Sequence, residues 1–271
     1  PPPPPPPLVT CDNWSALDVE REPLGHGHFR EAFLAGFGEH EVVLKVPFAT
    51  WNDTLDKKRR VFRTEVARLE RMRHASTVRL YGYCLDEPPP RLGVVVEPLI
   101  ALRDVVLDAR VTWAARVQLA VSAARMVQFW RAYVGADGAH SPRFFWDFKE
   151  ANVGVDVQRR NVKVVDVESF SYHVDLNAYH GIEQCSDDAQ CPPRRLVRYH
   201  HEVLQRLSEL RCDARSKRCG VLGERTNVFR ACFVVVRPLL TWPHVADRPR
   251  SARLGAALDA LFARCLAYDE R

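Results

Sequence analysis

The stretch Phe145–Phe170 constrains the fold and the chemistry of this chain more than any other. Asp147 and Asn152 stand close together, a valine-rich pair of short segments follows, and Asp166 comes directly after the second segment, Val162–Val165. Short apolar runs between polar residues are typical of buried strands. The pattern therefore predicts a strand pair that positions two carboxylates and one amide. The alternative is a polar loop between two ordinary strands.

Two glycines and a lysine mark the first part of the chain. Gly25 and Gly27 lie in a turn before Phe29 and Arg30, and Lys45 lies in the apolar segment Glu41–Pro47. Glycines let backbone N–H groups approach a phosphate closely, and an aromatic residue at the tip of the turn can cover it. A lysine on an apolar strand needs a partner for its charge. A plain hairpin turn and a lysine that reaches solvent at a strand edge are the alternatives.

A helix is expected next, over Asp56–Arg73, because apolar residues recur there with helical period. Glu65 lies near the apolar edge of this stripe and Glu70 lies towards its polar side, so Glu65 is the candidate partner of Lys45. A solvated helix charge is the alternative for Glu65.

Farther along the chain, the apolar run Leu92–Glu97 predicts a buried strand that ends in an acid. Pro98 follows this strand and cannot donate a backbone hydrogen bond.

Helices are also expected in the second half of the chain. Trp113–Tyr133 is the longest, and its broad apolar face is typical of a core helix. The residues of this face are Trp113, Val117, Leu119, Ala120, Ala124, Val127 and Trp130. The other apolar patterns predict helices over Leu196–Leu210, Glu224–Leu239 and Ser251–Leu266.

Composition narrows the class of protein. With 271 residues, of which 46% are apolar, the chain can bury a large core in one domain or two lobes. The net charge of +5 is scattered among acids and does not predict nucleic-acid binding. No apolar run approaches the roughly 20 residues that span a bilayer. We expect membrane contact only through a segment absent from this chain.

The eight cysteines indicate an oxidising compartment. Cys185 and Cys191 lie in one polar segment and Cys212 and Cys219 in another, without the close spacing typical of zinc ligands. Disulfides fit better. Pairing within each segment would close two small loops, although sequence does not fix the connectivity. Sequons at Asn13 and Asn52 add support for a secretory location, in the ER or Golgi lumen or outside the cell. The chain shows no signal peptide, and its start in seven prolines is typical of a fragment.

Together these residues resemble a protein kinase of the divergent secretory type, the group of vertebrate lonesome kinase and the divergent protein kinase domain proteins. The resemblance runs from Leu24 to about Cys265. It depends on Arg30 in place of the third loop glycine, on Asp166-Val-Glu168 in place of D-F-G, and on the segment Cys185–Cys191, with R-T-N-x-F farther on.

The resemblance implies an α+β, bilobal protein-kinase-like fold with a small β-rich N-terminal lobe and a larger helical C-terminal lobe. We expect a Pro-rich disordered tail over residues 1–13, the N-lobe over 14–99 and the C-lobe over 100–271, with a disulfide-bearing segment over 181–219. The resemblance also implies ATP with Mg²⁺ or Mn²⁺ as cofactors and a protein substrate of the secretory pathway as partner. The oligomeric state is left open.

Roles follow residue by residue from the resemblance. Lys45 would bind the nucleotide phosphates and pair with Glu65, Asp147 would accept the proton of the substrate hydroxyl, and Lys149 would neutralise the transferring phosphoryl group. Asn152 and Asp166 would hold the metal. The expected nucleotide-binding residues are Gly25, Gly27, Phe29, Lys45, Val96 and Glu97.

Several departures from the kinase pattern bear on function. Phe145 and Trp146 replace the usual His-Arg before the catalytic aspartate, so control by a phosphorylated activation loop is not expected. Glu168 puts an acid near the metal site. We expect disulfides, rather than phosphorylation, to order the segment after Asp166. The leading function is phosphoryl transfer to a Ser, Thr or Tyr hydroxyl. A secreted pseudokinase that binds without turnover is the main alternative, and a small-molecule kinase is a lesser one.

Overall fold

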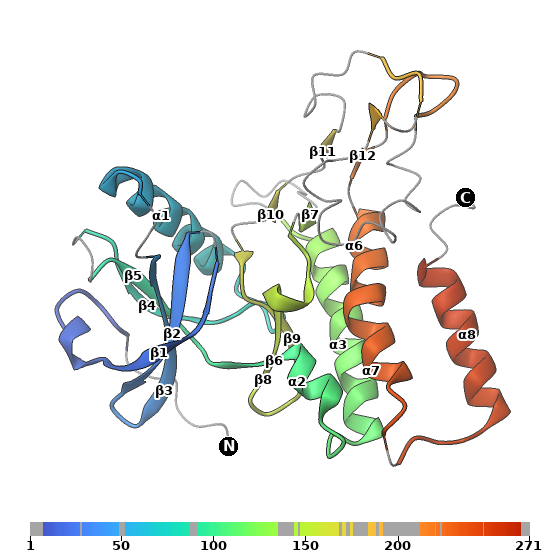
Figure 1. Cartoon of the computed structure of the whole chain (residues 1–271), viewed down its shortest axis with the longest axis horizontal. Coiled ribbons are helices and arrows are strands. Elements are labelled where there is room, and N and C mark those ends of the chain that lie inside the picture. Colours follow the sequence, from blue (N-terminus) through green and yellow to red (C-terminus); the bar gives the residue numbers. More distant parts are fainter. Residues whose placement is uncertain are drawn as a thin grey trace. The chain divides into compact units, whose positions relative to one another are not determined.

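The computed structural model describes residues 8–27, 29–48, 52–86, 91–134, 144–145, 147–167, 170–171, 174–175, 184–187, 190–191, 212–219, 221–222, 224–245 and 247–266. The fold is α+β, with a mostly antiparallel main sheet and several helices (Figure 1). The chain divides into two compact units. Unit 1 comprises Pro1–Leu99 and Val164–Glu168, and unit 2 comprises Ile100–Lys163 and Ser169–Arg271.

A five-stranded antiparallel sheet forms the centre of unit 1, in the order β1-β2-β3-β5-β4. Its strands are β1 (Asp18–His26), β2 (Arg30–Phe37), β3 (His40–Pro47), β4 (Leu80–Cys84) and β5 (Gly93–Val96). Successive side chains of a strand point to opposite faces. Val42 and Leu44 therefore join an apolar cluster with Trp14 and Val95, while Lys45 points to the other face.

The helix α1 (Leu55–Arg71) covers that other face through Phe62, Val66 and Leu69, which are buried. Thr54 caps its N-terminus, because its side-chain oxygen accepts a hydrogen bond from the backbone N–H of Lys57. The helix agrees with the prediction from periodicity. The strand predicted over Glu41–Pro47 is also confirmed as β3.

The segment before Trp14 corrects the expectation of a disordered tail up to residue 13. Val9 is buried and lies beside β4, where its N–H donates to the carbonyl of Tyr81 and its carbonyl accepts from Tyr83. A Cβ on Gly82 would collide with the carbonyl oxygen of Val9, so only glycine permits this approach. The prediction of disorder depended on the seven preceding prolines and did not take the apolar Val9 into account.

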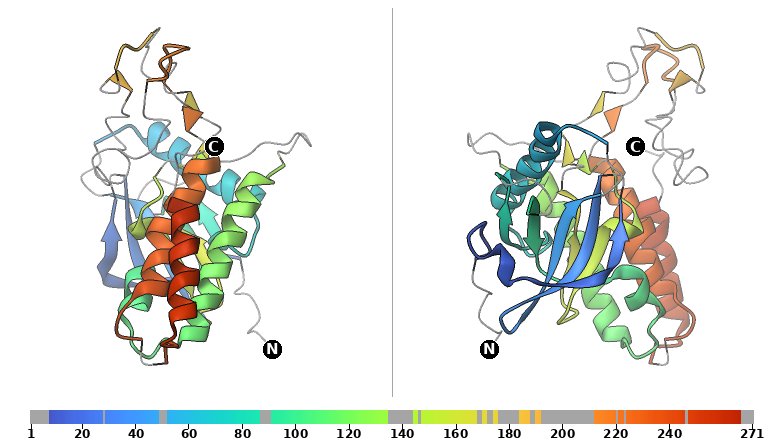
Figure 2. Two further views of the ribbon diagram at one scale, coloured as in Figure 1. Left: turned by 90° about the vertical axis from the view of Figure 1, so that its right-hand side faces the viewer. Right: turned by 60° about the vertical axis from the view of Figure 1, so that its left-hand side comes forward.

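Helices dominate unit 2. They are α2 (Leu102–Leu107), α3 (Trp113–Arg131), α6 (Glu224–Ala231), the π-helix η6 (Cys232–Val236), α7 (Arg237–Thr241) and α8 (Ala252–Leu266). Figure 2 shows α3, the run from α6 to α7, and α8 side by side, and their apolar contact includes Ala120, Leu240 and Leu258. The predicted helix over Glu224–Leu239 is interrupted by the π turn. Pro238 follows this turn, and proline lacks the N–H that a regular α-helix requires.

The long helix is present, but its buried face differs from the predicted one. Leu119, Ala120 and Trp130 are buried as expected, whereas Val117 is 38% exposed. Arg116 is instead fully buried, because its guanidinium donates to the backbone carbonyls of Val106, Asp108 and Val111. These bonds supply the partners that a buried charge requires.

Short strands carry the chain through the stretch that the sequence singled out. The three-stranded sheet has the order β6-β8-β9, formed by β6 (Leu99–Ala101), β8 (Val153–Asp156) and β9 (Val162–Val164). The predicted valine-rich strand pair is thus confirmed. The two small sheets pair β7 (Phe144–Phe145) with β10 (Phe170–Ser171) and β11 (Val174–Asp175) with β12 (Val221–Leu222).

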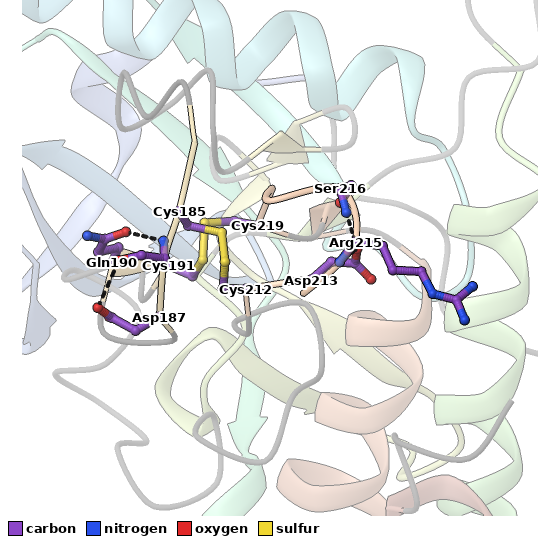
Figure 3. Close-up of a disulfide and its surroundings, with 10 residues drawn as sticks. Cys185, Asp187, Gln190, Cys191, Cys212, Asp213, Arg215, Ser216 and Cys219 are labelled. Atoms are coloured by element: carbon purple, nitrogen blue, oxygen red, sulfur yellow. Dashed lines mark hydrogen bonds between the residues drawn. A yellow bond between two sulfur atoms is a disulfide. The ribbon is translucent and has the colours of Figure 1, made fainter.

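Four disulfides account for all eight cysteines. They join Cys11 to Cys84, Cys185 to Cys212, Cys191 to Cys219, and Cys232 to Cys265. The expectation of disulfides is confirmed, but the pairings proposed within the two polar segments were wrong, since the bonds run between these segments (Figure 3). The helix predicted over Leu196–Leu210 lies outside the described residues.

Backbone hydrogen bonds explain the pairing. Cys212 and Cys219 face each other across an antiparallel bridge, closed by a turn in which the side chain of Asp213 accepts from the N–H groups of Arg215 and Ser216. The N–H of Cys185 donates to the carbonyl of Lys217 and brings the second segment alongside. The loop is therefore closed without its own disulfide.

Among the described helices none is long and apolar enough to cross a membrane.

Candidate active site

In unit 1 the predicted lysine and glutamate form a buried ion pair. The Nζ atom of Lys45 lies 2.7 Å from Oε1 of Glu65, whose side chain is fully buried. Burial alone would raise the pKa of Glu65, but attraction to Lys45 and Arg30 and the hydrogen bond from Lys45 outweigh it and hold the pKa below its ordinary value. Strand β3 and helix α1 therefore present a carboxylate that stays ionised between two cations.

Asp166 belongs to the same cluster, because unit 1 includes the segment that follows β9. The carbonyls on both sides of Asp166 are held: Lys45 Nζ donates to the carbonyl of Val165 at 2.6 Å, and Arg68 donates to that of Val167 at 3.2 Å. The backbone of Val164 also bonds with Ser76 and Val78. These bonds fix the backbone on both sides of Asp166, whose side chain is 23% exposed.

Arg30, which takes the place of the third loop glycine and had no predicted role in the site, contacts both acids. Its Nη1 atom lies 3.3 Å from Oε2 of Glu65 and 3.5 Å from Oδ1 of Asp166. Its guanidinium also lies over the ring of Phe62, 5.5 Å from the centroid. The sequence offered one signal for this role, a charged residue at the start of a strand whose other positions are largely apolar.

Gly25 lies near the end of β1, where it pairs with Ala32 of β2, and Gly27 lies in the turn between these two strands. The N–H of Gly27 donates to the carbonyl of Arg30 at 2.7 Å, which closes the turn. A Cβ on Gly25 would meet nothing within 4 Å, and one on Gly27 would make only an ordinary contact at 3.8 Å. The chain itself therefore has room for side chains at both positions. Open space at these two Cα positions fits the close approach of a phosphate to the backbone.

The other nucleotide candidates of unit 1 lie at or near strand ends. Val96 is buried on β5, where it pairs with Val43 of β3 and Leu80 of β4. The N–H of Glu97 donates to the carbonyl of Arg79, and the Glu97 carboxylate accepts from the N–H of Arg79. The backbone N–H and the carboxylate of Glu97 are thus both bonded to the backbone of Arg79. Phe29 lies at the turn, and its carbonyl accepts from the N–H of Phe48.

In unit 2, Asp147, Lys149 and Asn152 form a second cluster. Oδ2 of Asp147 accepts hydrogen bonds from Nζ of Lys149 at 2.7 Å and from Nδ2 of Asn152 at 2.8 Å. Nδ2 of Asn152 also donates to the backbone carbonyl of Asp147 at 2.8 Å. The amide nitrogen of Asn152 is thereby fixed, and its orientation leaves the amide oxygen as the atom to offer to a hard cation.

Helix α6 supports this cluster through two residues, Asn227 and Arg230, that were not among the predicted site residues. Oδ1 of Asn227 accepts from the N–H of Phe145 at 3.1 Å, and Nη1 of Arg230 donates to the carbonyl of Phe145 at 3.1 Å. Burial lowers the pKa of Arg230 to about 10, partly offset by attraction to Asp147. Both main-chain groups of Phe145, two residues before Asp147, are thus held.

Aromatic packing completes that support. The rings of Phe145, Phe148 and Trp130 contact one another edge to face, with centroids 5.4 to 5.7 Å apart. Phe145 and Phe148 flank Asp147 in sequence and are buried, whereas Asp147 is partly exposed. The apolar neighbours therefore anchor the loop and leave the carboxylate accessible to a substrate.

Comparison with known proteins bears on the family. No protein-family model matches the chain. The calcium/calmodulin-regulated receptor-like kinase 1 of Arabidopsis thaliana is 28% identical over 146 residues, which are 53% of this chain and 31% of that protein. The similarity indicates a kinase-like relationship over about half of the chain. The chain covers less than a third of the length of this relative.

Chemically, the described residues offer what a phosphate and a divalent cation require. Lys45 and the glycines Gly25 and Gly27 suit phosphate oxygens. The carboxylate of Asp166 in unit 1 and the amide oxygen of Asn152 in unit 2 are each an oxygen ligand of the type that Mg²⁺ or Mn²⁺ prefers. The sulfur atoms of Cys185, Cys191 and Cys212 also lie within 4.8 Å of one another, but all three are oxidised in disulfides and provide no thiolate for a metal.

Proposed function

We propose that this chain is an ATP-dependent protein kinase that transfers the γ-phosphoryl group to a hydroxyl of a secretory-pathway or extracellular protein. The observation that carries the proposal is the buried Lys45–Glu65 pair, with Nζ of Lys45 also bound to the backbone beside Asp166. An ion pair of this kind costs desolvation and gives little stability by itself. Its use is to place one ammonium group at a fixed point next to a candidate metal ligand.

In this mechanism the residues position groups and stabilise charge, since phosphoryl transfer needs little covalent help from the protein. Lys45 holds the nucleotide phosphates. Asp147 orients the acceptor hydroxyl and takes its proton, and Lys149, now paired with Asp147, balances negative charge on the transferring group. Asp166 and Asn152 would hold a divalent metal, which would neutralise charge on the phosphates.

The cysteine chemistry supports the proposed location. Four disulfides are consistent with an oxidising environment such as the secretory pathway or the extracellular space. The kinase that is similar to this chain supports the reaction class alone. We propose a bilobal arrangement on the same basis, with unit 1 as the β-rich lobe and unit 2 as the helical lobe.

The direct test uses protein purified from a secretory host, incubated with γ-labelled ATP and Mg²⁺ or Mn²⁺ and a mixture of secreted proteins. We expect label on protein with the wild type, none with Asp147→Ala, and wild-type activity with Asp259→Ala, an exposed acid on α8. Equal labelling by wild type and Asp147→Ala would refute catalysis by this site. Binding of ATP without labelling under any condition would support the pseudokinase alternative.

A further inference from the structure

Arg30 brings a second cation into the phosphate site, and its position is fixed by the fold. Its backbone pairs with Pro47 on β3, and its carbonyl accepts from Gly27 across the turn. The side chain is 10% exposed and reaches Glu65 and Asp166, which lie 35 and 136 positions farther along the chain. Main-chain bonds at its base and two carboxylates at its tip define one placement of the guanidinium.

The charges of this cluster balance because of Arg30. Lys45 and Arg30 are the cations and Glu65 and Asp166 the anions, so the formal sum is zero. Without Arg30 the sum would be −1, and a polyanionic nucleotide would meet net repulsion until a metal ion bound Asp166. Arg30 therefore supplies, at Asp166, positive charge of the kind that a divalent cation would bring.

Resting on the proposed function, we propose that Arg30 is a nucleotide-phosphate ligand that lets this site bind ATP before, and without, a divalent metal. Asp166 and Glu65 hold the guanidinium, and the backbone carbonyl of Arg30 accepts the hydrogen bond that closes the turn at Gly27. A planar guanidinium makes bidentate bonds with phosphate as well as with carboxylate. Because Arg30 and a metal compete for Asp166, the same residue weakens binding of the metal alone.

Loss of Arg30 should lower the affinity for ATP without metal and raise the affinity for a metal ion alone. Misfolding would lower both affinities, so the two explanations can be distinguished. In Arg30→Gln, the affinity for ATP measured in EDTA should fall roughly tenfold or more, the value of one charge-assisted hydrogen bond. The affinity for Mn²⁺ alone, measured by electron paramagnetic resonance of the free ion, should rise. Arg30→Lys keeps the charge and should retain ATP affinity in EDTA within about threefold of the wild type. Arg21→Gln, an exposed arginine on β1, should change neither quantity.

The outcomes can be told apart. If the wild type binds ATP with metal, and Arg30→Gln binds ATP in EDTA as tightly as the wild type does, this inference is overturned and the proposed function stands. If Arg30→Gln loses ATP and Mn²⁺ binding together, Arg30→Lys decides: restored ATP affinity in EDTA supports the role of the charge, and continued loss overturns it. If the wild type binds no ATP under any condition, the proposed function and this inference both fail.

Discussion

Asn227 accepts a hydrogen bond from the backbone N–H of Phe145, two residues before Asp147. This contact joins helix α6 to the loop that carries the candidate catalytic base, across 82 positions of sequence. Arg230, one turn farther along the helix, holds the carbonyl of the same residue. The polar residues of α6 thus have a structural task, which is to fix the backbone from which Asp147 projects.

Asn227→Ala should weaken this support. Loss of the acceptor leaves the buried N–H of Phe145 without its partner, which costs about 1–3 kcal/mol of unfolding free energy. Phosphoryl transfer should fall further than nucleotide affinity, since Lys45 and Asp166 belong to unit 1. Chemical denaturation and steady-state kinetics measure the two effects. Val228→Ala, at an exposed neighbouring position, should change stability by no more than about 0.5 kcal/mol; an equal loss in both variants would contradict the assignment.

Glu65→Gln should lower stability in a pH-dependent way. The pKa of Glu65 lies below its ordinary value of 4.5 in the folded protein. The ionised carboxylate therefore contributes its full stabilisation above about pH 4.5, and this is lost as the pH falls through the folded-state pKa. At pH 7 the variant should be less stable by roughly 3–5 kcal/mol, because two buried cations lose their shared anion.

Thermal unfolding from pH 7 down to pH 3 measures this difference. The gap between wild type and Glu65→Gln should stay constant above about pH 4.5 and narrow below it. Glu70→Gln, an exposed change on the same helix, serves as the control and should follow the wild type throughout. A gap that widened in acid would mean that Glu65 carries a raised pKa.

Substitution by alanine should affect Gly25 and Gly82 differently, because a Cβ on Gly25 meets open space and one on Gly82 meets the backbone of Val9. Gly25→Ala adds a methyl group in open space and should leave unfolding free energy unchanged or raise it by about 0.4–1 kcal/mol. Its affinity for ATP should nevertheless fall, since the methyl occupies the proposed approach of the phosphate. Gly82→Ala places the methyl against the Val9 carbonyl and should cost about 1–3 kcal/mol. Calorimetry of each variant with and without ATP checks both; normal ATP affinity in Gly25→Ala would remove the turn from the site.

Peptide mapping without reductant should find Cys185 joined to Cys212 and Cys191 to Cys219. Trypsin alone leaves Cys185 and Cys191 on one peptide, because no lysine or arginine lies between them. A second digestion before Asp187 separates them and makes the pairing readable. Partial reduction should lower activity before the helices unfold if these bonds order the segment after Asp166. Recovery of Cys185 linked to Cys191 would contradict the structure.

Local patterns were enough to predict much of the fold and part of the site. The two-residue period of β3 and the helical period of α1 placed Lys45 and Glu65 on surfaces that meet. The same local reasoning could not predict the contacts of Arg30 with Glu65 and Asp166 or that of Arg230 with Phe145. Their partners lie far away in sequence. A charged side chain at the start of a strand or on an amphipathic helix is ordinarily expected to be exposed to solvent. The prediction of a bond between Cys212 and Cys219 was wrong for a related reason. Hydrogen bonds to Asp213 already close the loop between these two cysteines, so a disulfide is not needed to close it.

The bond between Cys11 and Cys84 joins residues 73 positions apart, and Arg30, Lys45 and Glu65 all lie between them. A protease that cuts once in this interval, for example among the basic residues at the start of α1, leaves both pieces in one covalent molecule. Electrophoresis without reductant would then show a chain of unchanged mass, and only reduction would release the fragments. A nicked protein of this kind can keep its phosphate-site residues together and pass for an intact one.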